Sequence, residues 1–517
     1  MTQATLAPTR NARRTLLVAV IGSSMAFLDG TVVNVALPVM QRELALTVAG
    51  AQWVVEAYAL LLASLVLVGG ALGDRYGRKR MFLAGVVLFS AASAACGAAP
   101  TSLLLVAARA VQGVGAALLV PGSLALISAA FADDQARGRA IGTWSSFSAI
   151  TAAVGPVAGG WVVTHASWRW LFYFNLPIGA LVLALAYAAV PETRDDAAPR
   201  TMDWGGAALV TGGLGLVVYG LIDSGKVAGE VGEIALVVLG IVTLGAFVFV
   251  ESRLDAPMVP LALFRSATFS GVNVLTLLLY GALGSALFLV PFDLIQVQGY
   301  SPTAAGASLL PLVLLVSVMS PYAGALSARI GPRILLAVGP VVAGAGFFLL
   351  ALPGIGGSYW TTFFPGIVVL GLGMGITVAP LTTAVMGSVD RRHAGVASGI
   401  NNAVSRAAGL LAIAVLGVVL QSRFDHALDA RLAPLQLPAA IAAKVAVERS
   451  KLGAADLGDV EGPLRDALRD AFAQAFVAGF RTVMLAGAAL AALGGVAALV
   501  MVRNAEREGD RSRAVRS

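Results

Sequence analysis

Fourteen separate apolar stretches run through the chain, each long enough to cross a lipid bilayer. A helix rises 1.5 Å per residue, so about 20 residues span a hydrocarbon core of about 30 Å. Because a backbone in hydrocarbon must satisfy its own hydrogen bonds, we expect every stretch to be a helix. The predicted spans are residues 14–38, 50–73, 80–99, 102–126, 140–163, 171–191, 204–222, 231–251, 268–292, 303–327, 333–353, 360–386, 394–420 and 473–502.

The overall composition excludes a soluble globular protein. Hydrophobic residues make up 58% of the 517 residues and charged residues only 12%. The net charge of +7 could indicate nucleic-acid binding, but most basic residues lie in short loops between spans, so no nucleic-acid partner is expected. The single cysteine, Cys96, is expected to be a small core residue, and three scattered histidines predict no metal site. No catalytic constellation or cofactor motif is visible, which predicts a protein that is not an enzyme.

The distribution of Lys and Arg predicts how the chain is oriented. With the amino terminus inside, the internal segments carry 22 of the 35 basic residues, whereas the short external loops carry only Arg42, Arg169 and Lys226. Cytoplasmic loops carry the excess of positive charge in membrane proteins. We therefore predict a multi-pass protein of the cytoplasmic membrane with both termini in the cytoplasm.

A repeated loop predicts two similar halves. Residues 70–80 follow the second span, and a decayed copy at residues 324–333 follows the tenth, so both would occupy equivalent cytoplasmic loops. Parallel repeats of six spans with a substrate site at their interface are a transporter architecture. The predicted fold is all-α, with two six-helix bundles plus two inserted transmembrane helices. The predicted divisions are a first bundle at 1–191, the insertion with its linkers at 192–267, a second bundle at 268–502 that includes an extracytoplasmic loop at 422–472, and a cytoplasmic tail at 503–517.

The first span contains an ionisable residue, Asp29, at a depth where charge is costly and usually functional. Two interpretations are open. The carboxylate is either a structural group paired with a neighbouring helix, or a group that takes up and releases a proton during work. We favour the second.

Two more ionisable residues lie in spans of the first half at a similar level. At 1.5 Å per residue, Glu56 lies about 9 Å and Asp29 about 13 Å from the external ends of their spans, and Arg109 lies in the fourth span. Three such groups in one layer predict a proton-coupling site, although Arg109 could also form a plain structural ion pair. We rank Asp29 above Glu56, because Glu56 lies nearer to the headgroups and could simply be solvated.

Three further segments combine glycine, charge and amide side chains in recognisable patterns. They are Leu28–Pro38, which includes Asn34, the loop Gly70–Arg80, and Arg109–Ala116, which includes Gln112. These patterns resemble those of the major facilitator superfamily and, more closely, of its fourteen-span drug:proton antiporter family. The resemblance covers essentially the whole membrane region.

The resemblance implies roles for particular residues. It implies a latch that closes the cytoplasmic side, formed by Gly70, Asp74, Arg75, Gly77 and Arg78. It associates Arg109 with proton transfer. It also implies an antiporter motif at the end of the fifth span, comprising Gly155, Pro156, Gly159 and Gly160. The residues of this motif alone predict only a kinked helix that packs closely against others.

The second half has fewer ionisable residues in its spans. In the thirteenth span one helical strip contains Gly395, Gly399, Asn402, Arg406 and Gly409. This strip fits a gate or cavity wall, although a helix-packing seam explains the glycines equally well. Asp293 is expected to be an interfacial, solvated acid. A helix that begins near Pro463 is expected to lie on the membrane surface before the last span.

These features together predict a transporter. The predicted function is proton-coupled efflux of hydrophobic drugs or toxic compounds, which we expect to be cationic, by alternating access. Protons, a small hydrophobic substrate and the bilayer are the expected partners of a monomer. The alternatives are a dedicated exporter of one metabolite, antibiotic or lipid, a proton-coupled importer, and a receptor or assembly factor that transports nothing.

Overall fold

The computed structural model describes residues 10–131, 133–194, 203–222, 229–254, 257–390, 394–458 and 460–503. Within these ranges the chain is helical, and fourteen helices are long and apolar enough to cross a membrane. The prediction of an all-α polytopic membrane protein is therefore confirmed. The predicted tail at 503–517 lies outside the described residues from position 504 onward.

The first bundle contains six spans, the last of which is preceded by a short helix. Its helices are α1 (Arg10–Glu43), α2 (Val48–Tyr76), α3 (Arg78–Ala98), α4 (Ser102–Ala130), α5 (Asp134–His165), α6 (Trp170–Tyr173) and α7 (Asn175–Ala189). Hydroxyl caps start several of them. The Thr47 side chain accepts from Gly50 N at 3.1 Å and the Thr101 side chain from Leu104 N at 3.4 Å, which satisfies amide groups that a helix start leaves free.

The second bundle repeats this plan and follows two inserted helices. The inserted helices are α8 (Trp204–Ile222) and α9 (Gly229–Glu251). The second bundle comprises α10 (Ala267–Phe292), the π-helical turn η2 (Asp293–Val297), α11 (Pro302–Ser308), α12 (Leu310–Ile330), α13 (Pro332–Leu350), α14 (Phe363–Gly387), α15 (Ala394–Leu432), α16 (Ala439–Glu448), η5 (Arg449–Ala454) and α17 (Pro463–Met501), with short 3-10 turns η1 (Leu261–Arg265) and η4 (Ala433–Leu435).

The backbone of the two repeated loops is alike. Gly77 separates α2 from α3 with φ 114°, and Gly331 separates α12 from α13 with φ 83°. Only glycine adopts such angles without strain, so each loop can turn between its helices in a single residue. The two loops therefore share a turn as well as a sequence pattern.

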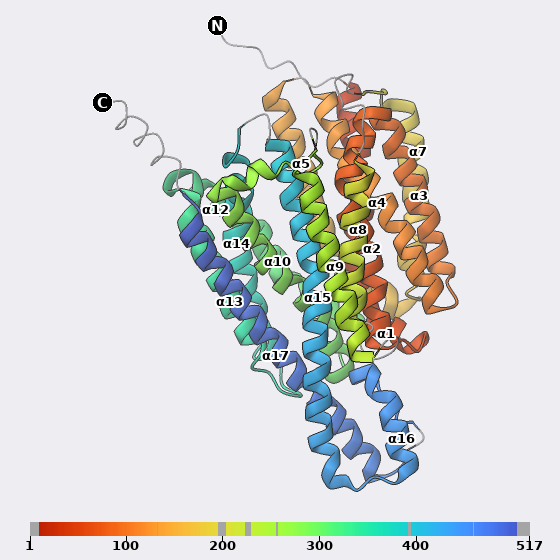
Figure 1. Ribbon diagram of the computed structural model, residues 1–517. Coiled ribbons are helices and arrows are strands. Elements are labelled where there is room, and N and C mark those ends of the chain that lie inside the picture. Colours follow the sequence, from red (N-terminus) through yellow and green to blue (C-terminus); the bar gives the residue numbers. More distant parts are fainter. Residues whose placement is uncertain are drawn as a thin grey trace.

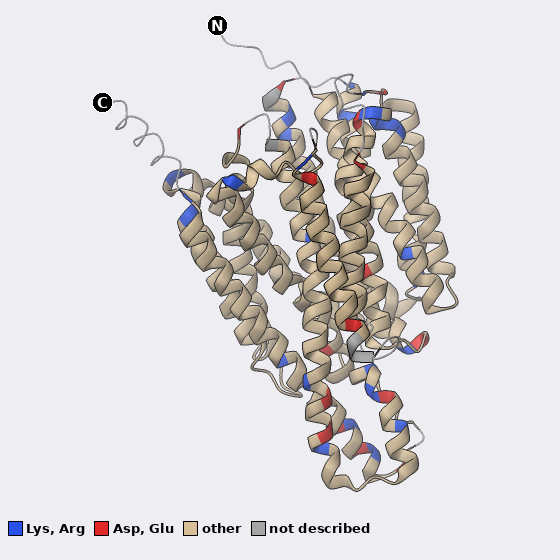
Figure 2. Ribbon diagram, viewed as in Figure 1, with Lys and Arg blue, Asp and Glu red and all other residues tan. Residues whose placement is uncertain are grey.

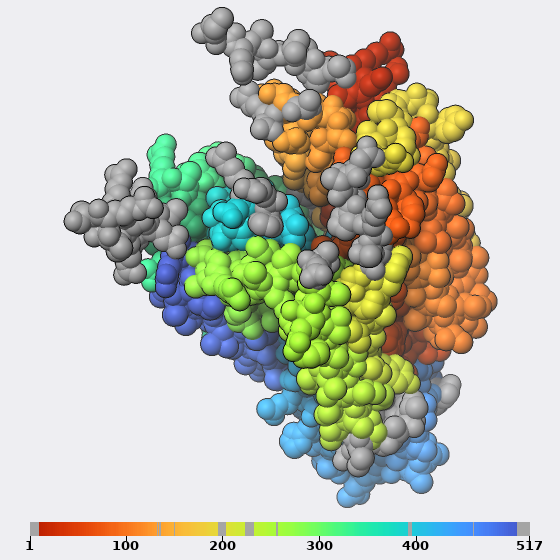
Figure 3. All heavy atoms as spheres, turned by 45° about the horizontal axis from the view of Figure 1, so that its top comes forward, coloured from red at the N-terminus to blue at the C-terminus, as the bar shows by residue number. Residues whose placement is uncertain are grey.

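The two bundles stand side by side, and α1 begins and α17 ends at the same end of the molecule (Figure 1). We call this the inner end and the opposite one the outer end. Lys and Arg predominate at the inner end, whereas the outer end carries charges of both signs and the middle of the spans carries few charges (Figure 2). At the inner end a hollow separates the helices of the first bundle from those of the second (Figure 3).

At the outer end the bundles are joined by direct contacts. Gln52 Nε2 of α2 donates to Ile413 O of α15 at 3.1 Å, and Gln296 Nε2 donates to Gln41 Oε1 at 2.8 Å. Gln41 Nε2 in turn donates to Lys451 O at 3.1 Å. The molecule is thus closed at the outer end and parted at the inner end.

The region between α15 and α17 is a helical hairpin that projects beyond the spans at the outer end (Figure 1). Since α17 runs unbroken over 39 residues, it is about 58 Å long, nearly twice the hydrocarbon thickness. The expectation that residues from Pro463 lie on the membrane surface is therefore wrong, because this segment continues the axis of the last span. Arg449 holds the hairpin together through Asp429 at 2.5 Å and Asp425 at 3.7 Å.

The inserted helices α8 and α9 pack against each other, and α8 packs against α2 and α15 on one flank of the seam between the bundles (Figure 1). Leu214 and Val218 of α8 join Leu60 of α2 and Leu410 of α15 in one apolar cluster. The insertion therefore contacts both bundles.

Candidate functional site: a buried charge cluster in the first bundle

Asp29 and Arg109 form an ion pair in the interior of the first bundle. Both side chains are almost completely buried, and Arg109 Nη1 donates to Asp29 Oδ2. Gln112, one helical turn after Arg109, completes a triangle: its Oε1 accepts from Arg109 Nη1 at 2.7 Å and its Nε2 donates to Asp29 Oδ1 at 2.9 Å. The spacing of three residues in α4 puts Arg109 and Gln112 on one face, as the sequence indicated.

Further polar groups extend this cluster to five helices. Arg109 Nε donates to Val54 O of α2 at 2.9 Å, and Gln112 Nε2 donates to Ser93 Oγ of α3 at 2.7 Å. Asn175 Nδ2 of α7 donates to Ser93 Oγ at 3.2 Å. A fully bonded polar network in a low-dielectric interior is rigid, because losing one partner leaves another group unsatisfied.

The guanidinium of Arg109 also lies against aromatic rings. Its Cζ is 4.3 Å from the ring centre of Tyr58 and 5.8 Å from that of Phe172, within reach of a cation–π attraction. Gly113 lets α4 approach this closely, since a Cβ at Gly113 would lie 2.5 Å from Tyr58 O. The glycine of the motif is thus explained by helix contact.

Open space lies beside the cluster. Gly30 is exposed although it is in the middle of α1, and nothing lies within 4 Å of the position a Cβ would take. Asn34, one turn further along α1, is half-buried and its Oδ1 has no hydrogen-bond partner among the described residues. The exposed surface thus begins one residue after Asp29, whereas Asp29 itself and the Asn34 acceptor are buried.

Glu56 is separate from this cluster. It is fully buried, which corrects the expectation that headgroups or water solvate it. Both of its carboxylate oxygens have no hydrogen-bond partner among the described residues. It follows Gln52 by one turn of α2, on the side that faces α15 of the second bundle, so it lies toward the seam rather than toward Arg109. An ionised carboxylate there has no counter-charge to offset its desolvation.

The antiporter-motif residues form contacts to both bundles. Gly155 and Gly159 of α5 lie directly against Thr31 and Val32 of α1, and Gly160 lies against Pro302 of α11. Pro156 O in turn meets the position that a Cβ would take at Gly306 of α11. These small residues let α5 bridge the bundles at the outer end.

The latch residues lie at the inner end within the first bundle. Asp74 pairs with Arg78, one turn away, at 2.8 Å, and Arg75 lies over the ring of Tyr76. Among the described contacts of this loop, Glu192 at the end of α7 accepts from the first amides of α3, Lys79 N at 3.0 Å and Arg80 N at 3.1 Å. Among the described residues, the hydrogen bonds and ion pairs of this loop thus stay within the first bundle. Gly70 packs near Pro121 of α4.

Residues 19–413 match the family model of the Major Facilitator Superfamily. The chain belongs to this superfamily. It is 37% identical to the Multidrug resistance protein Stp of Mycobacterium tuberculosis over 81% of this chain and 78% of that protein. It is 33% identical to the Tetracenomycin C resistance and export protein of Streptomyces glaucescens over 82% and 79%. A bacterial homologue of the lysosomal transporter Spinster shares the fold, with a TM-score of 0.69 at 16% identity over 97% of this chain and 99% of that one.

The second bundle of this facilitator fold contributes a smaller polar cluster. Asn401 Nδ2 of α15 donates to Thr276 Oγ1 at 2.8 Å and to Asn273 Oδ1 at 3.1 Å, both on α10. Sequence reasoning singled out neighbouring Asn402, which is exposed and bonds only to Ser398 O of its own helix. An amide side chain within a span needs a hydrogen-bond partner, so the sequence could have indicated that Asn401 bonds to another helix.

Arg406 is a cationic residue within the membrane-spanning part of α15. It is half-buried in the middle of a span, and the described residues give it no ion pair or hydrogen bond. The expectation that Asp293 is a solvated acid is wrong. Asp293 is buried just after the outer end of α10, where Gln298 Nε2 donates to it at 3.2 Å.

Proposed function

We propose that the protein exports hydrophobic compounds in exchange for protons by alternating access of its two bundles. Transport rather than catalysis follows from membership of the major facilitator superfamily. The relatives named above are called multidrug and antibiotic resistance proteins, which supports a drug or antibiotic as the substrate class. The inner end would face the cytoplasm, because Lys and Arg gather there.

The observation that carries the proposal is the buried pairing of Asp29 with Arg109. Asp29 is a carboxylate that can bind either a proton or a cationic substrate, and Arg109 supplies the charge that stabilises its empty form. A proton or cation arriving at Asp29 competes with Arg109 for the same oxygens. Competition of this kind couples two ligands, since each lowers the affinity for the other.

The cycle we propose starts from the conformation described here. With the outer end closed and the inner end parted, Asp29 is ionised and paired, and substrate enters from the cytoplasm or the inner leaflet. Opening at the outer end then exposes the cluster to external protons, which displace the substrate. The loop with Asp74 and Arg78 would engage the second bundle only in that second state.

Glu56 has a different role in this scheme. Because it faces the seam between the bundles and lacks a counter-charge, its ionisation would be costly whenever the outer end is closed. We propose that it carries a second proton, or binds the cationic group of a substrate, when the bundles move apart. The membrane potential contributes about 2.3 kcal/mol per charge per 100 mV, so a second proton would make export of a monovalent cation sensitive to potential.

Efflux from inverted membrane vesicles tests the proposal. A fluorescent cationic dye should accumulate in vesicles containing the wild-type protein when an imposed pH gradient is present. Vesicles that contain an equal amount of folded Asp29→Asn protein should show no uphill accumulation. Undiminished uphill transport by that variant would remove Asp29 from the mechanism.

A dedicated exporter is the second candidate, and the names of relatives favour it. Two of them are named for resistance to single antibiotics, tetracenomycin C and puromycin, at 33% and 36% identity. A panel of unrelated cations and antibiotics in the same vesicles separates the two possibilities. Several structurally unrelated substrates support multidrug export, whereas a single one supports a dedicated exporter.

A further inference from the structure

A groove on the first bundle is lined by three of its helices and ends at a cluster of arginines. The α1 groove, as we call it, has a volume of about 470 Å³ and is lined by α1, α5 and α7. Arg13, Leu17 and Leu28 of α1 form its floor, with Phe147 of α5 and Leu181 of α7 on its two walls. Since all its lining residues belong to the first bundle, it is distinct from the space between the bundles.

The groove has the length of one membrane leaflet. Arg13 and Leu28 are fifteen residues apart on α1, which corresponds to about 22 Å along the helix. Half of the hydrocarbon core is about 15 Å thick, and the headgroup region adds several ångströms. The groove therefore extends from the headgroups at the inner end to about the middle of the bilayer.

The walls of the groove suit an acyl chain. Leu17, Phe147 and Leu181 are each about half exposed, with exposed fractions of 51%, 49% and 50%. Toward the deep end Thr151 Oγ1 of α5 donates to Ser24 Oγ of α1 at 3.2 Å, so these two lining hydroxyls are paired with each other. A molecule that fills it needs an apolar tail no longer than one leaflet.

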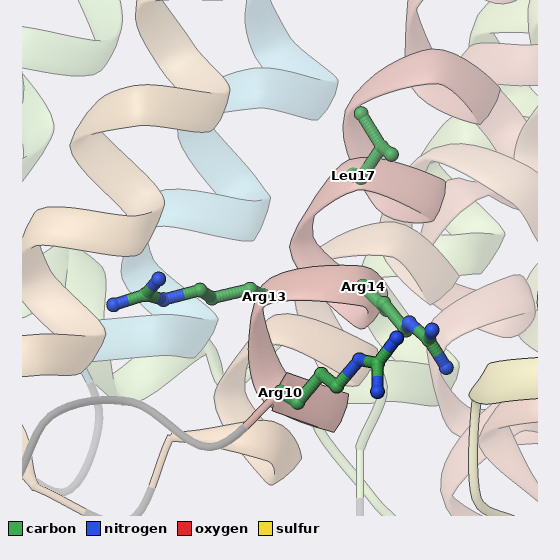
Figure 4. A pocket seen from close by; sticks show the side chains of 4 residues that line it. All are labelled: Arg10, Arg13, Arg14 and Leu17. Carbon is green, nitrogen blue, oxygen red and sulfur yellow. The ribbon is translucent and has the colours of Figure 1, made fainter.

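Positive charge surrounds the open end. Arg10, Arg13, Arg14 and Leu17 line a second hollow of about 410 Å³, which shares Arg13 and Leu17 with the groove. Arg13 points to one side of α1 whereas Arg10 and Arg14 extend to the other (Figure 4). No acidic side chain is among the described residues that line either hollow. A phosphate at this level would meet guanidinium groups next to an apolar channel.

We propose that the α1 groove is a binding site for an anionic phospholipid of the inner leaflet, with an acyl chain along α1 and the phosphate at Arg13. Basic pockets between helices on the cytoplasmic side bind anionic headgroups in other membrane proteins. The apolar channel distinguishes this site from general attraction to a charged surface. The lipid would lie against the segment of α1 that leads to Asp29.

Lipid retention by the purified protein tests the site without using transport. Detergent-solubilised protein is mixed with equal amounts of phosphatidylglycerol and phosphatidylcholine of the same chain length, and the bound lipid is measured by native mass spectrometry. Wild type should retain phosphatidylglycerol preferentially. Arg13→Gln should weaken this retention about 5-fold, which equals about 1 kcal/mol for one arginine near an anionic lipid.

Two matched controls separate the groove from its surroundings. Arg14→Gln removes the same charge from the same turn but not from the groove, so it should weaken retention less than Arg13→Gln. Leu181→Trp should fill the groove and reduce retention, whereas Leu239→Trp on α9, at 52% exposure, should not. Equal retention of the two lipids, equal effects of the two arginine variants, or release of the lipid by inorganic phosphate alone would overturn the proposal.

Discussion

Asp29→Asn tests whether the ion pair in the first bundle holds the helices together as well as coupling transport. The substitution keeps the shape of the side chain but leaves the guanidinium of Arg109 buried without a counter-charge. Breaking a buried pair by removing one partner costs about 3–5 kcal/mol. We expect the lower end of that range, because Val54 O and Gln112 Oε1 still accept from Arg109.

A double variant separates charge from packing. In Asp29→Asn with Arg109→Gln no charge remains in the cluster, so we expect about 1–3 kcal/mol of the loss to be recovered. The control is Asp293→Asn, because Asp293 is also buried but is bonded, among the described residues, to the amide of Gln298 and not to a cation. Its stability should change by about 1 kcal/mol or less, as for a neutral hydrogen bond.

The midpoint of thermal unfolding in detergent gives the order of stability. Wild type and Asp293→Asn should be highest, the double variant intermediate and Asp29→Asn lowest. In vesicles both variants at Asp29 should fail to export against a gradient, whatever their stability. The reasoning is refuted if the double variant is as unstable as Asp29→Asn, since the cost would then not come from an unpaired Arg109.

Three more predictions concern the seam and the latch. Glu56→Gln should leave stability nearly unchanged but reduce the dependence of efflux on the pH gradient, and an unchanged dependence measured in vesicles would exclude Glu56 from coupling. Gly306→Val should place its side chain against Pro156 O and hold the outer end open, which would increase the labelling of cysteines engineered at that end. The control is Gly245→Val, which should have no effect because a Cβ there meets nothing within 4 Å. Glu192→Ala should lower stability by about 1 kcal/mol, because two amides at the start of α3 lose their acceptor, and an unchanged unfolding midpoint would contradict that assignment.

Much of the fold was predictable because a bilayer permits few solutions. The lengths of the apolar stretches predicted the fourteen spans. The repeated glycine loops indicated two halves, and their turns at Gly77 and Gly331 are alike in the structure. The hairpin between α15 and α17 was not predicted correctly. Hydropathy shows where a helix leaves the membrane but not whether it then bends along the surface or continues straight.

The sequence predicts how deep each site residue lies in the membrane, but not which neighbouring helix its side chain faces. The level of Asp29 and Arg109 followed from counting residues, and the structure pairs them. The same count put Glu56 near the headgroups, yet its burial depends on α15, which lies far away in sequence. Long-range contacts of this kind leave no periodic signal in the chain.

The inserted helices α8 and α9 change how membrane-dissolved molecules can approach the transporter. They cover the flank where α2 meets α15, and Leu60, Leu214 and Leu410 close that side with apolar contacts. On the other flank α5 meets α12, whose Val318 and Tyr322 are exposed. A hydrophobic compound that diffuses in the bilayer therefore finds a protein with two unlike sides, one screened by a pair of extra helices and one that presents the bundles directly to the lipid.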